Sequence, residues 1–453
     1  MFSIEVKKKK KTISYMNKEV NYPKFSVIIP QKNRAEYIEF TLRTCMLQDY
    51  PNFEIIVSDD CSDDNSVEVI SKLATIDSRI KLFAHKTHLG MHDNFEFALN
   101  QVKEGYVIAL GGDDGLTPGC IWRMYDIFQE TKKELLTWEP SIFVYPENSP
   151  NTTFCVKRYK KRCVKILRSE DFLNKMAKTF RYLVSENPMF YVKGCASIEV
   201  VNRVKSRTKD HSFYYCPTPD GYSGVVLAGE VEDYAFTNEP LSIIGTSPKS
   251  QGSNYHRTDE KSREEAAQFF NDNVRRTMHE KLASQPYSPL ITLMTADYLL
   301  TANDLPGWPG KFEMFSMETL LMRTFNFIQN SGFSVEVLAR ELVILRNIAI
   351  QHGLLDLYNE LLSNTKKRIG RSAGVKGMAI TKYVRFDGTD IGINNIFDAS
   401  IATPFVFNST SLFSTKNVIS IVANTFKILF NRNRYTTVNL PSVEEIEKLA
   451  SKE

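Results

Sequence analysis

Short apolar segments alternate with segments of helical periodicity over the first 110 residues of the chain. The apolar segments are rich in β-branched and aromatic residues and are bounded by turn-forming residues, which predicts buried strands. The predicted strands cover residues 25–30, 53–60, 80–85 and 105–110, and the predicted helices cover residues 35–49, 64–77 and 91–103. Strands that alternate with helices of this length predict βαβ units and a parallel sheet.

The pattern changes twice further along the chain. It becomes mixed after residue 116, with predicted strands at 187–194 and 240–245 and a loop that enters a helix at 216–230. It becomes helical from about residue 258, and residues 366–377 have the composition of a linker. The pattern therefore divides the chain into a basic flexible tail (1–22), an α/β domain (23–257), a helical domain (258–365) and a C-terminal extension (366–453).

The four predicted N-terminal strands end in polar sequences. The segment PQKNR ends the first strand, SDDCSDD the second, HKTH the third and GGDDG the fourth. In open α/β sheets ligands bind outside the carboxyl ends of the strands. The concentration of polar residues at these ends therefore predicts a binding site along one edge of the sheet.

The fourth strand ends in an acidic turn, VIALGGDDGL, with Asp113 and Asp114 side by side. Two neighbouring carboxylates repel each other unless a cation or hydrogen-bond donors compensate their charge. Mg²⁺ and Mn²⁺ bind one or two carboxylates and complete their shells with water and phosphate oxygens. Glycines on both sides of the pair would let the backbone approach such a ligand. The turn suits a metal–diphosphate site, and an ordinary solvated turn is the alternative interpretation.

Composition narrows the class of protein. The 453 residues are 42% hydrophobic and 24% charged with a formal net charge of +4, which is typical of a globular protein and does not call for a nucleic-acid partner. No apolar stretch approaches the roughly 20 residues of a membrane-spanning helix. Seven scattered cysteines without a CxxC motif indicate a reducing, cytoplasmic location.

Two segments raise the question of membrane contact. The Lys7–Lys11 run could meet anionic lipid, and the amphipathic stretch 417–434 could lie on a membrane surface. A solvated tail and packing on its own domain are the respective alternatives. These segments predict a peripheral contact at the inner face of the plasma membrane as an addition to the cytoplasmic location. The sequence leaves the oligomeric state open.

The segments SVIIPQKNR, FEIIVSDDCSDDNS and GYVIALGGDDGLTPG together resemble the family 2 glycosyltransferases of the GT-A fold. The resemblance covers residues 24–130 well and continues more faintly to about 257, where TPDGYSG and PLSIIGTSPKSQGS are similar to bacterial members that build surface polysaccharides. It implies a Rossmann-like, mostly parallel sheet flanked by helices, followed here by a mainly helical C-terminal region.

The resemblance also implies a donor site. Pro30 and Arg34 would border the base and phosphates, and Asp59 would accept a hydrogen bond from the base N3–H. Asp113 and Asp114 match the metal-binding acidic motif, with Asp114 facing the ion and Asp113 shared between ribose and metal. Many members carry a further aspartate just upstream, where this chain has glycine.

On the acceptor side, Asp220 matches the family's acidic position and would act as the catalytic base. A Pro-Asp-Gly turn is its structural alternative. His256 lies where some GT-A enzymes place a late metal ligand, although a lone histidine is more often a surface residue. The segment 247–257 suits either a mobile lid over the donor or a simple linker.

These residues predict an inverting glycosyltransferase that uses Mn²⁺ or Mg²⁺. It would move a hexosyl or N-acetylhexosaminyl group from a nucleotide-diphosphate sugar, with a UDP-sugar as the leading candidate. The acceptor would be a hydroxyl of a glycan or lipid-linked molecule in O-antigen or capsule synthesis. The alternatives are a non-catalytic scaffold that binds nucleotide-sugar and a sugar-1-phosphate nucleotidyltransferase. The latter needs a glycine-rich loop after the first strand, where this chain has PQKNRAEY.

Overall fold

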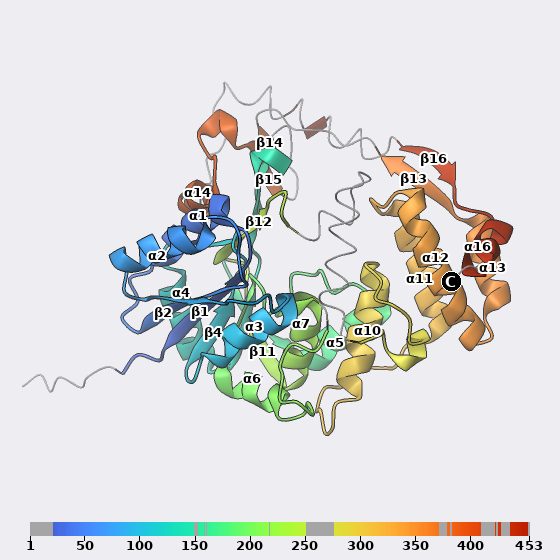
Figure 1. The fold of residues 1–453 in the computed structure, drawn as a ribbon, viewed down its shortest axis with the longest axis horizontal. Helices are drawn as coiled ribbons and strands as arrows, with labels where there is room; N and C mark the ends of the chain where they lie inside the picture. Colours follow the sequence, from blue (N-terminus) through green and yellow to red (C-terminus); the bar gives the residue numbers. More distant parts are fainter. Residues whose placement is uncertain are drawn as a thin grey trace, which may run out of the picture.

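A computed structural model gives the arrangement of the chain (Figure 1). It describes residues 21–148, 153–157, 159, 161–216, 218–250, 276–370, 378–380, 383–408, 422, 425–426 and 435–451. His256, the tail 1–20 with its lysine run, and most of the stretch 417–434 lie outside the described residues.

The main sheet has eight strands in the order β3-β2-β1-β4-β10-β6-β11-β9. Its strands are β1 (Phe25–Gln31), β2 (Phe53–Asp59), β3 (Ile80–Ala84), β4 (Tyr106–Ala109), β6 (Leu135–Trp138), β9 (Val164–Arg168), β10 (Gly194–Ser197) and β11 (Asp233–Thr237). Strands β3, β2, β1 and β4 are parallel neighbours, and β6 pairs in parallel with β11. The inserted β10 runs antiparallel to both β4 and β6. The predicted α/β class with a mostly parallel sheet is confirmed.

Helices cover both faces of the main sheet. They are α1 (Ala35–Met46), α2 (Ser66–Ile76), α3 (Met91–Asn100), α4 (Cys120–Thr131), α5 (Ser169–Thr179), α6 (Ile198–Lys205) and α7 (Pro219–Gly229). Side chains alternate across a strand, so Val27 and Ile29 of β1 join the core under α1, α2 and α4. Ile28 joins the opposite core with α3, α5, α6 and α7. Burial of one such side chain contributes about 1.5–3 kcal/mol.

A second sheet lies beside the first, in the order β14-β15-β8-β7-β12-β5. Its strands are β5 (Gly115–Leu116), β7 (Ser141–Val144), β8 (Thr153–Lys157), β12 (Ser242–Thr246), β14 (Met378–Ile380) and β15 (Tyr383–Asp387). The short helix η1 (Pro146–Asn148) follows β7. Strand β15 pairs with β8 although more than 220 residues separate them. The C-terminal part of the chain therefore completes a sheet that the N-terminal part begins.

The C-terminal region is mainly helical, as predicted. It contains η2 (Glu280–Leu282), α10 (Ile291–Asn303), α11 (Met317–Asn330), α12 (Val335–Gln351), α13 (Leu355–Asn364), η3 (Thr389–Ile391), α14 (Ile396–Asn408) and α16 (Val443–Ala450). Helix α10 packs on α7, so one hydrophobic core runs from the main sheet into this region. Helix α14 returns to the second sheet and packs on α1 (Figure 1).

Two local predictions were wrong. Residues 187–193 form a buried loop rather than the first part of a strand, and β10 begins only at Gly194. Val192 adopts φ 63°, and the loop is apolar because it packs under α5 and α7 rather than because it extends. Residues 366–370 are not a linker but β13 (Lys366–Gly370), which pairs with β16 (Tyr435–Asn439). Its partner lies about 70 residues later in the chain, so local composition gives no sign of the pairing.

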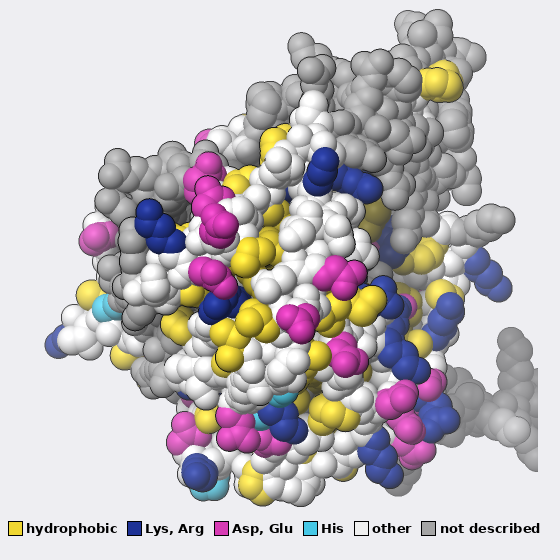
Figure 2. Space-filling model, turned by 90° about the vertical axis from the view of Figure 1, so that its right-hand side faces the viewer, with side chains coloured by type: hydrophobic (Ala, Val, Ile, Leu, Met, Phe, Trp, Pro, Cys, Tyr) yellow, Lys and Arg dark blue, Asp and Glu magenta, His cyan; other side chains and the backbone are white. Residues whose placement is uncertain are grey.

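Charged side chains of both signs lie on the surface, as the small net charge of the chain predicts. On the face turned toward the viewer in Figure 2, acidic and basic side chains are interspersed with hydrophobic ones. None of the helices in the described part of the chain has the length and apolar character needed to span a bilayer.

Candidate active site

The loops after β1 and β2 are joined to each other by side-chain hydrogen bonds. The Asn33 backbone N–H donates to Ser62 Oγ at 2.8 Å, and the Asp63 N–H donates to Asn33 Oδ1 at 3.0 Å. The Arg34 N–H donates to Ser66 Oγ at 2.9 Å at the start of α2. Because β1 and β2 are parallel, both loops leave the same edge of the sheet. The predicted site residues Pro30, Arg34 and Asp59 therefore lie together at this edge.

Asp59 is fully buried between these loops. Its Oδ1 accepts from the Ser62 N–H at 3.0 Å, and its Oδ2 accepts from Ser62 Oγ at 2.6 Å and from Gln31 Nε2. Three of the roughly four acceptor positions of the carboxylate are thus already used by protein donors. The base-binding role of Asp59 stays a prediction.

The neighbouring acidic residues fix the loops. Asp60 accepts from the backbone N–H groups of Leu89 at 2.6 Å and Gly90 at 3.1 Å, and so ties the end of β2 to the start of α3. Asp64 accepts from the Ala35 N–H at 3.1 Å at the start of α1. These carboxylates satisfy backbone donors that would otherwise be unpaired at the ends of elements.

The acidic turn after β4 is buried, with Asp113 4% and Asp114 1% exposed. Asp114 Oδ2 accepts from the Gly111 N–H and Oδ1 from the Gly245 N–H, both at 2.8 Å, and the Tyr191 hydroxyl also donates to this carboxyl group. Burial first, and then the charge of Asp113, raises the pKa of Asp114 to about 8. Asp114 thus joins the turn to β12 and to the loop before β10.

Asp113 has a more open environment. Its Oδ2 accepts from Ser247 Oγ at 2.6 Å and from Ser250 Oγ at 2.8 Å, whereas its Oδ1 receives no hydrogen bond from the residues that the structure describes. Its backbone carbonyl accepts from the Tyr145 hydroxyl at 3.2 Å. Among the described residues, hydrogen bonds therefore occupy only one of the two side-chain oxygens of Asp113.

The segment that follows β12 also meets the loop after β1. Arg34 Nη2 donates to the Lys249 carbonyl at 2.6 Å, and Lys249 Nζ donates to the Asn33 carbonyl at 2.8 Å. The described start of the predicted lid, residues 247–250, thus bridges the first strand end and the acidic turn. Its remainder, with His256, lies outside the described residues.

Close backbone packing explains the glycines around the acidic turn. A Cβ at Gly245 would lie 1.7 Å from the Asp113 carbonyl oxygen. A Cβ at Gly112 would lie 3.0 Å from Arg34 Cγ, and one at Gly111 would lie 2.7 Å from Asp114 Oδ2. Any side chain here would displace the groups that position the acidic pair. Gly112 lies against the Arg34 side chain and leaves little room for a side chain of its own.

The acidic pair fits a hard divalent cation. In the described residues neither carboxylate has an ion-pair partner, so their charge is compensated by neutral donors only. Carboxylate oxygens are the ligands that Mg²⁺ and Mn²⁺ prefer. No group of three or more His, Cys, Asp and Glu side chains that could hold a metal occurs within the described ranges. An ion here would thus need ligands from the donor diphosphate or from residues outside those ranges.

Asp220 lies in the first turn of α7. Its Oδ1 accepts from the Gly221 N–H at 2.8 Å, and its Oδ2 accepts from the Tyr182 hydroxyl at 3.3 Å. Burial raises the pKa of its carboxyl group above the ordinary value. The adjacent Thr218 hydroxyl is 2.7 Å from that of Tyr298, so α10 of the helical region packs directly behind this carboxylate.

One loop connects Asp220 to the acidic turn. The Phe190 N–H donates to Ser223 Oγ at 2.9 Å in the first turns of α7, and the next residue, Tyr191, reaches Asp114. Sequence reasoning missed Tyr191, Tyr145 and Ser247. The apolar run around Tyr191 suggested a strand, and only the folded chain brings these hydroxyl groups to the acidic pair.

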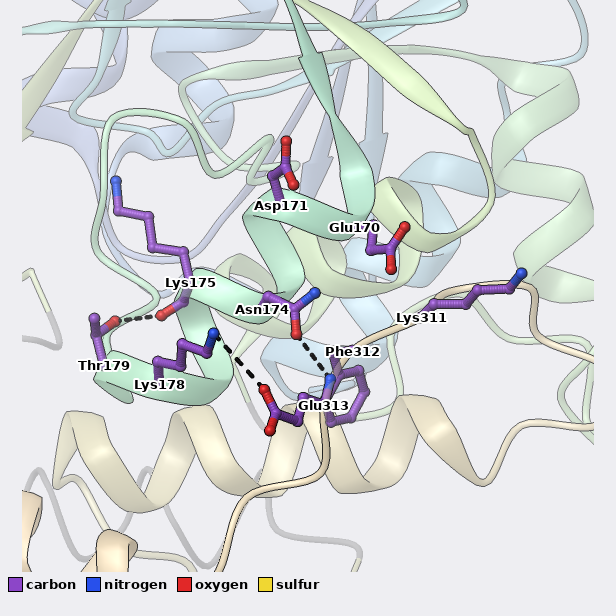
Figure 3. A pocket seen from close by; sticks show the side chains of 9 residues that line it. All are labelled: Glu170, Asp171, Asn174, Lys175, Lys178, Thr179, Lys311, Phe312 and Glu313. Carbon is purple, nitrogen blue, oxygen red and sulfur yellow. Dashed lines mark hydrogen bonds and ion pairs between the residues drawn. The ribbon is translucent and has the colours of Figure 1, made fainter.

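A cavity of about 770 Å³ lies elsewhere, between α5 and residues 311–313 (Figure 3). Lys178 Nζ is 3.7 Å from Glu313 Oε2 across it, and the Glu313 N–H donates to Asn174 Oδ1 at 2.8 Å. None of the predicted site residues lines this cavity. Because it lies apart from these residues, we assign it no part in the site.

Comparison with known proteins identifies the segment that carries the acidic turn. Residues 26–179 match the model described as glycosyl transferase family 2. This segment is a family 2 glycosyltransferase domain. The family assignment implied by the sequence motifs is thus confirmed for these residues. The α/β class with a mostly parallel sheet, described above, accompanies this match.

Bacterial relatives share this family 2 domain. The chain is 37% identical over 100 residues to the GalNAc(5)-diNAcBac-PP-undecaprenol beta-1,3-glucosyltransferase of Campylobacter jejuni, which is 22% of this chain and 32% of that protein. It is 34% identical over 92 residues to the putative teichuronic acid biosynthesis glycosyltransferase TuaG of Bacillus subtilis, which is 20% of this chain and 36% of that protein. The chain thus spans about a third of the length of each relative.

Among solved structures, the chain is similar to Staphylococcus aureus TarS 1-349 in complex with UDP-GlcNAc. The TM-score is 0.41 at 14% identity, over 75% of this chain and 90% of that one. The mannosyltransferase PcManGT of Pyrobaculum calidifontis, in complex with GDP-Man and Mn²⁺, gives a TM-score of 0.36 at 14% identity, over 76% and 86% of the two chains.

Proposed function

We propose that the chain is an inverting glycosyltransferase that uses a nucleotide-diphosphate sugar, with residues 23–257 as the transferase domain. The observation that carries the proposal is the buried pair Asp113–Asp114, which has no ion-pair partner among the described residues, within a family 2 domain at the edge where the loops after β1, β2 and β12 meet. A site of this kind binds an anionic ligand through a cation.

Each predicted residue has a role in the proposal. Pro30 and Arg34 border the nucleotide, and Asp59 accepts from its base. Asp113 and Asp114 hold Mn²⁺ or Mg²⁺, with His256 as a further proposed ligand. The open oxygen of Asp113 makes it the principal contact, because both oxygens of Asp114 already accept backbone N–H groups. The cation supplies positive charge beside the leaving diphosphate.

Asp220 is the proposed base. Its carboxylate takes the proton from the acceptor hydroxyl as the hydroxyl oxygen forms a bond to the anomeric carbon of the sugar. The bond between that carbon and the diphosphate oxygen breaks on the opposite face, and the diphosphate leaves with the electron pair. The configuration at the anomeric carbon is therefore inverted. The raised pKa of Asp220 brings its proton affinity closer to that of a base that works near neutral pH.

The relatives guide the choice of substrates. Their names place them in the synthesis of an undecaprenol-linked glycan and of teichuronic acid. We propose that this chain transfers a hexosyl or N-acetylhexosaminyl group from a UDP-sugar to a glycan or lipid-linked acceptor of a bacterial surface polysaccharide. It would act in the cytoplasm or at the inner face of the plasma membrane.

A donor screen tests this proposal. UDP-glucose, UDP-GlcNAc, UDP-GalNAc and GDP-mannose are each added with and without Mn²⁺, and the melting temperature and the release of nucleotide are measured. We expect one donor to raise the melting temperature only with Mn²⁺, since a ligand that binds only the folded state stabilises it. If no donor does so, the proposal is wrong. Binding without nucleotide release under any acceptor condition would identify a scaffold.

A further inference from the structure

A second group of charged side chains lies at the same edge of the main sheet as the acidic turn. Strand β10 runs antiparallel to both β4 and β6, so β4 and β6 run in the same direction. Glu139, which follows β6, therefore leaves the sheet at the edge where Asp113 and Asp114 follow β4. Only β10 lies between the two strands.

Glu139 is part of a buried ion pair. Its Oε2 is 2.9 Å from Lys157 Nζ, and the side chains are 10% and 9% exposed. Lys193 is 4% exposed, and its Nζ donates to the carbonyls of Val184 and Ser185, both at 2.8 Å. Burial lowers the pKa of Lys193 to about 8. Buried charges are costly unless paired, which makes such a group unusual for a purely structural loop.

The loop under these lysines leads to the proposed base. Lys157 Nζ donates to Ser185 Oγ at 2.9 Å. Three residues earlier in the same loop, the Tyr182 hydroxyl donates to Asp220. The charged group and Asp220 are therefore held by a single short segment, residues 182–185.

Two tyrosines lie beside the charged group. Lys157 Nζ is 5.3 Å from the centre of the Tyr159 ring, and Tyr159 is 36% exposed. Tyr383 is half-buried and pairs with Lys157 across β15 and β8, so their side chains are on the same face of the second sheet. Burial, and then the charge of Glu139, raises the pKa of both phenols. Tyr383 comes from the C-terminal segment, which thus reaches this surface.

We propose that Glu139, Lys157, Tyr159, Ser185, Lys193 and Tyr383, the Lys157 cluster, bind a neutral sugar ring of the acceptor. The proposal rests on the proposed function. Tyrosines present an apolar face with a polar tip, and fixed charged groups offer donors and acceptors to hydroxyls. Lys157 is paired with Glu139. Lys193 donates to two backbone carbonyls and is influenced by the charge of Glu139 and then of Glu186, which itself pairs with Lys175 at 3.0 Å. These partners favour a neutral ligand over a phosphate.

Binding of methyl glycosides tests the proposal without donor or metal. Methyl glycosides of glucose, galactose, GlcNAc and GalNAc are titrated into the full-length protein and followed by saturation-transfer NMR. We expect at least one to bind, and Tyr159→Ala and Tyr383→Ala to weaken that binding roughly 5- to 10-fold. Tyr383→Leu keeps apolar volume in β15 and serves if the alanine variant does not fold. Phe405→Ala is the control, since Phe405 is a 72% exposed aromatic outside the cluster.

The proposal is overturned if no methyl glycoside binds, if binding is the same in all variants, or if inorganic phosphate displaces the bound glycoside and binds more tightly. These outcomes are separate from those of the donor screen. Sugar binding that depends on the tyrosines, without any nucleotide release, would uphold the subsite and reject the transferase. Nucleotide release without sugar binding that depends on the tyrosines would uphold the transferase and reject the subsite.

Discussion

The two halves of the main sheet are assembled in different ways. The proposed donor half, strands β3, β2, β1 and β4, comes from one continuous stretch, residues 25–109, and its proposed binding loops follow consecutive strands. The proposed acceptor half consists of strands β10, β6, β11 and β9, and the polar groups assigned to it come from residues as far apart as Glu139 and Tyr383. The donor half is therefore a local motif, whereas the acceptor half depends on the whole chain.

This difference separates what each half would do. The donor half offers two neighbouring carboxyl groups without an ion-pair partner among the described residues, which suits a metal–diphosphate ligand. The acceptor half offers paired charges, tyrosines and a carboxylate of raised pKa, which suits hydroxyl groups and proton transfer. Variants in the two halves should therefore change different kinetic parameters. If they change the same ones, the division into a donor half and an acceptor half is wrong.

The largest effect is expected for Asp220→Asn in the acceptor half. The amide cannot take the proton from the acceptor hydroxyl, so turnover should fall roughly 10²- to 10⁴-fold. Donor affinity should stay unchanged, because Asp220 makes no contact with the acidic turn among its hydrogen bonds to described residues. Steady-state kinetics and calorimetry with donor and Mn²⁺ measure the two quantities. Turnover near the wild-type value would move the base elsewhere.

The same variant should make the protein more stable. Burial raises the pKa of Asp220, so this group's contribution to folding is full below the ordinary carboxyl pKa and is lost as the pH rises through the folded value. Near neutral pH folding of the wild type must either desolvate this carboxylate or add a proton to it, a cost that asparagine does not carry. We therefore expect a higher melting temperature for Asp220→Asn at pH 7 and no such gain at pH 4. A lower melting temperature at pH 7 would mean that the hydrogen bonds to Asp220 outweigh its burial.

The next effect is expected for Asp113→Asn in the donor half. Loss of the open carboxylate should weaken Mn²⁺-dependent donor binding about 100-fold, since a cation contact of this kind contributes several kcal/mol. Asp63→Asn is a matched control, because Asp63 is exposed in the loop after β2. Calorimetry with the donor identified in the screen measures both. If Asp113→Asn and Asp63→Asn bind the donor with equal affinity, the acidic turn is not the metal site.

The sequence predicted the strands and helices of the donor half well because the signals for them are local. Apolar runs end in polar turns within a few residues, and the order of strands and helices forces those turns to one edge. The resemblance placed Asp114 toward the ion, whereas the hydrogen bonds favour Asp113 as the principal contact in our proposal. The difference arises from the Gly245 N–H and from Ser247, which are more than 130 residues away.

The acceptor half was predicted less well for the same physical reason. The loop 187–193 is apolar because it is buried, and periodicity does not distinguish a buried loop from a buried strand. The pairing of β15 with β8, which brings Tyr383 to Lys157, leaves no local signal at all. Asp220 could be predicted only through its resemblance to a family position.

A smaller effect is expected where the two serines orient Asp113. The double variant Ser247→Ala/Ser250→Ala removes both donors to Asp113 Oδ2. Hydrogen bonds to a charged group contribute about 1.5–3 kcal/mol, and water can replace part of this at a ligand-accessible site. We expect the KM for donor to rise about 5- to 10-fold with little change in kcat. A fall in kcat at unchanged KM would place these serines in the chemical step instead.

The smallest effect is expected for Tyr182→Phe, and it is the most specific test of Asp220 as the base. The Tyr182 hydroxyl donates to Asp220 at 3.3 Å and lowers the pKa of that carboxyl, against the larger effect of burial. Without this donor the pKa should rise further, so the acid limb of the profile of kcat against pH should move to higher pH, with kcat at its plateau reduced about two- to fivefold. Tyr234→Phe is the matched control, since it removes a hydroxyl that donates to the Glu186 carbonyl at 2.8 Å but does not touch Asp220. The pKa of a catalytic base sets the position of the acid limb, so only a change at the base itself should move it. An equal shift in both variants would therefore indicate a general loosening of the fold and contradict the assignment of Asp220 as the base.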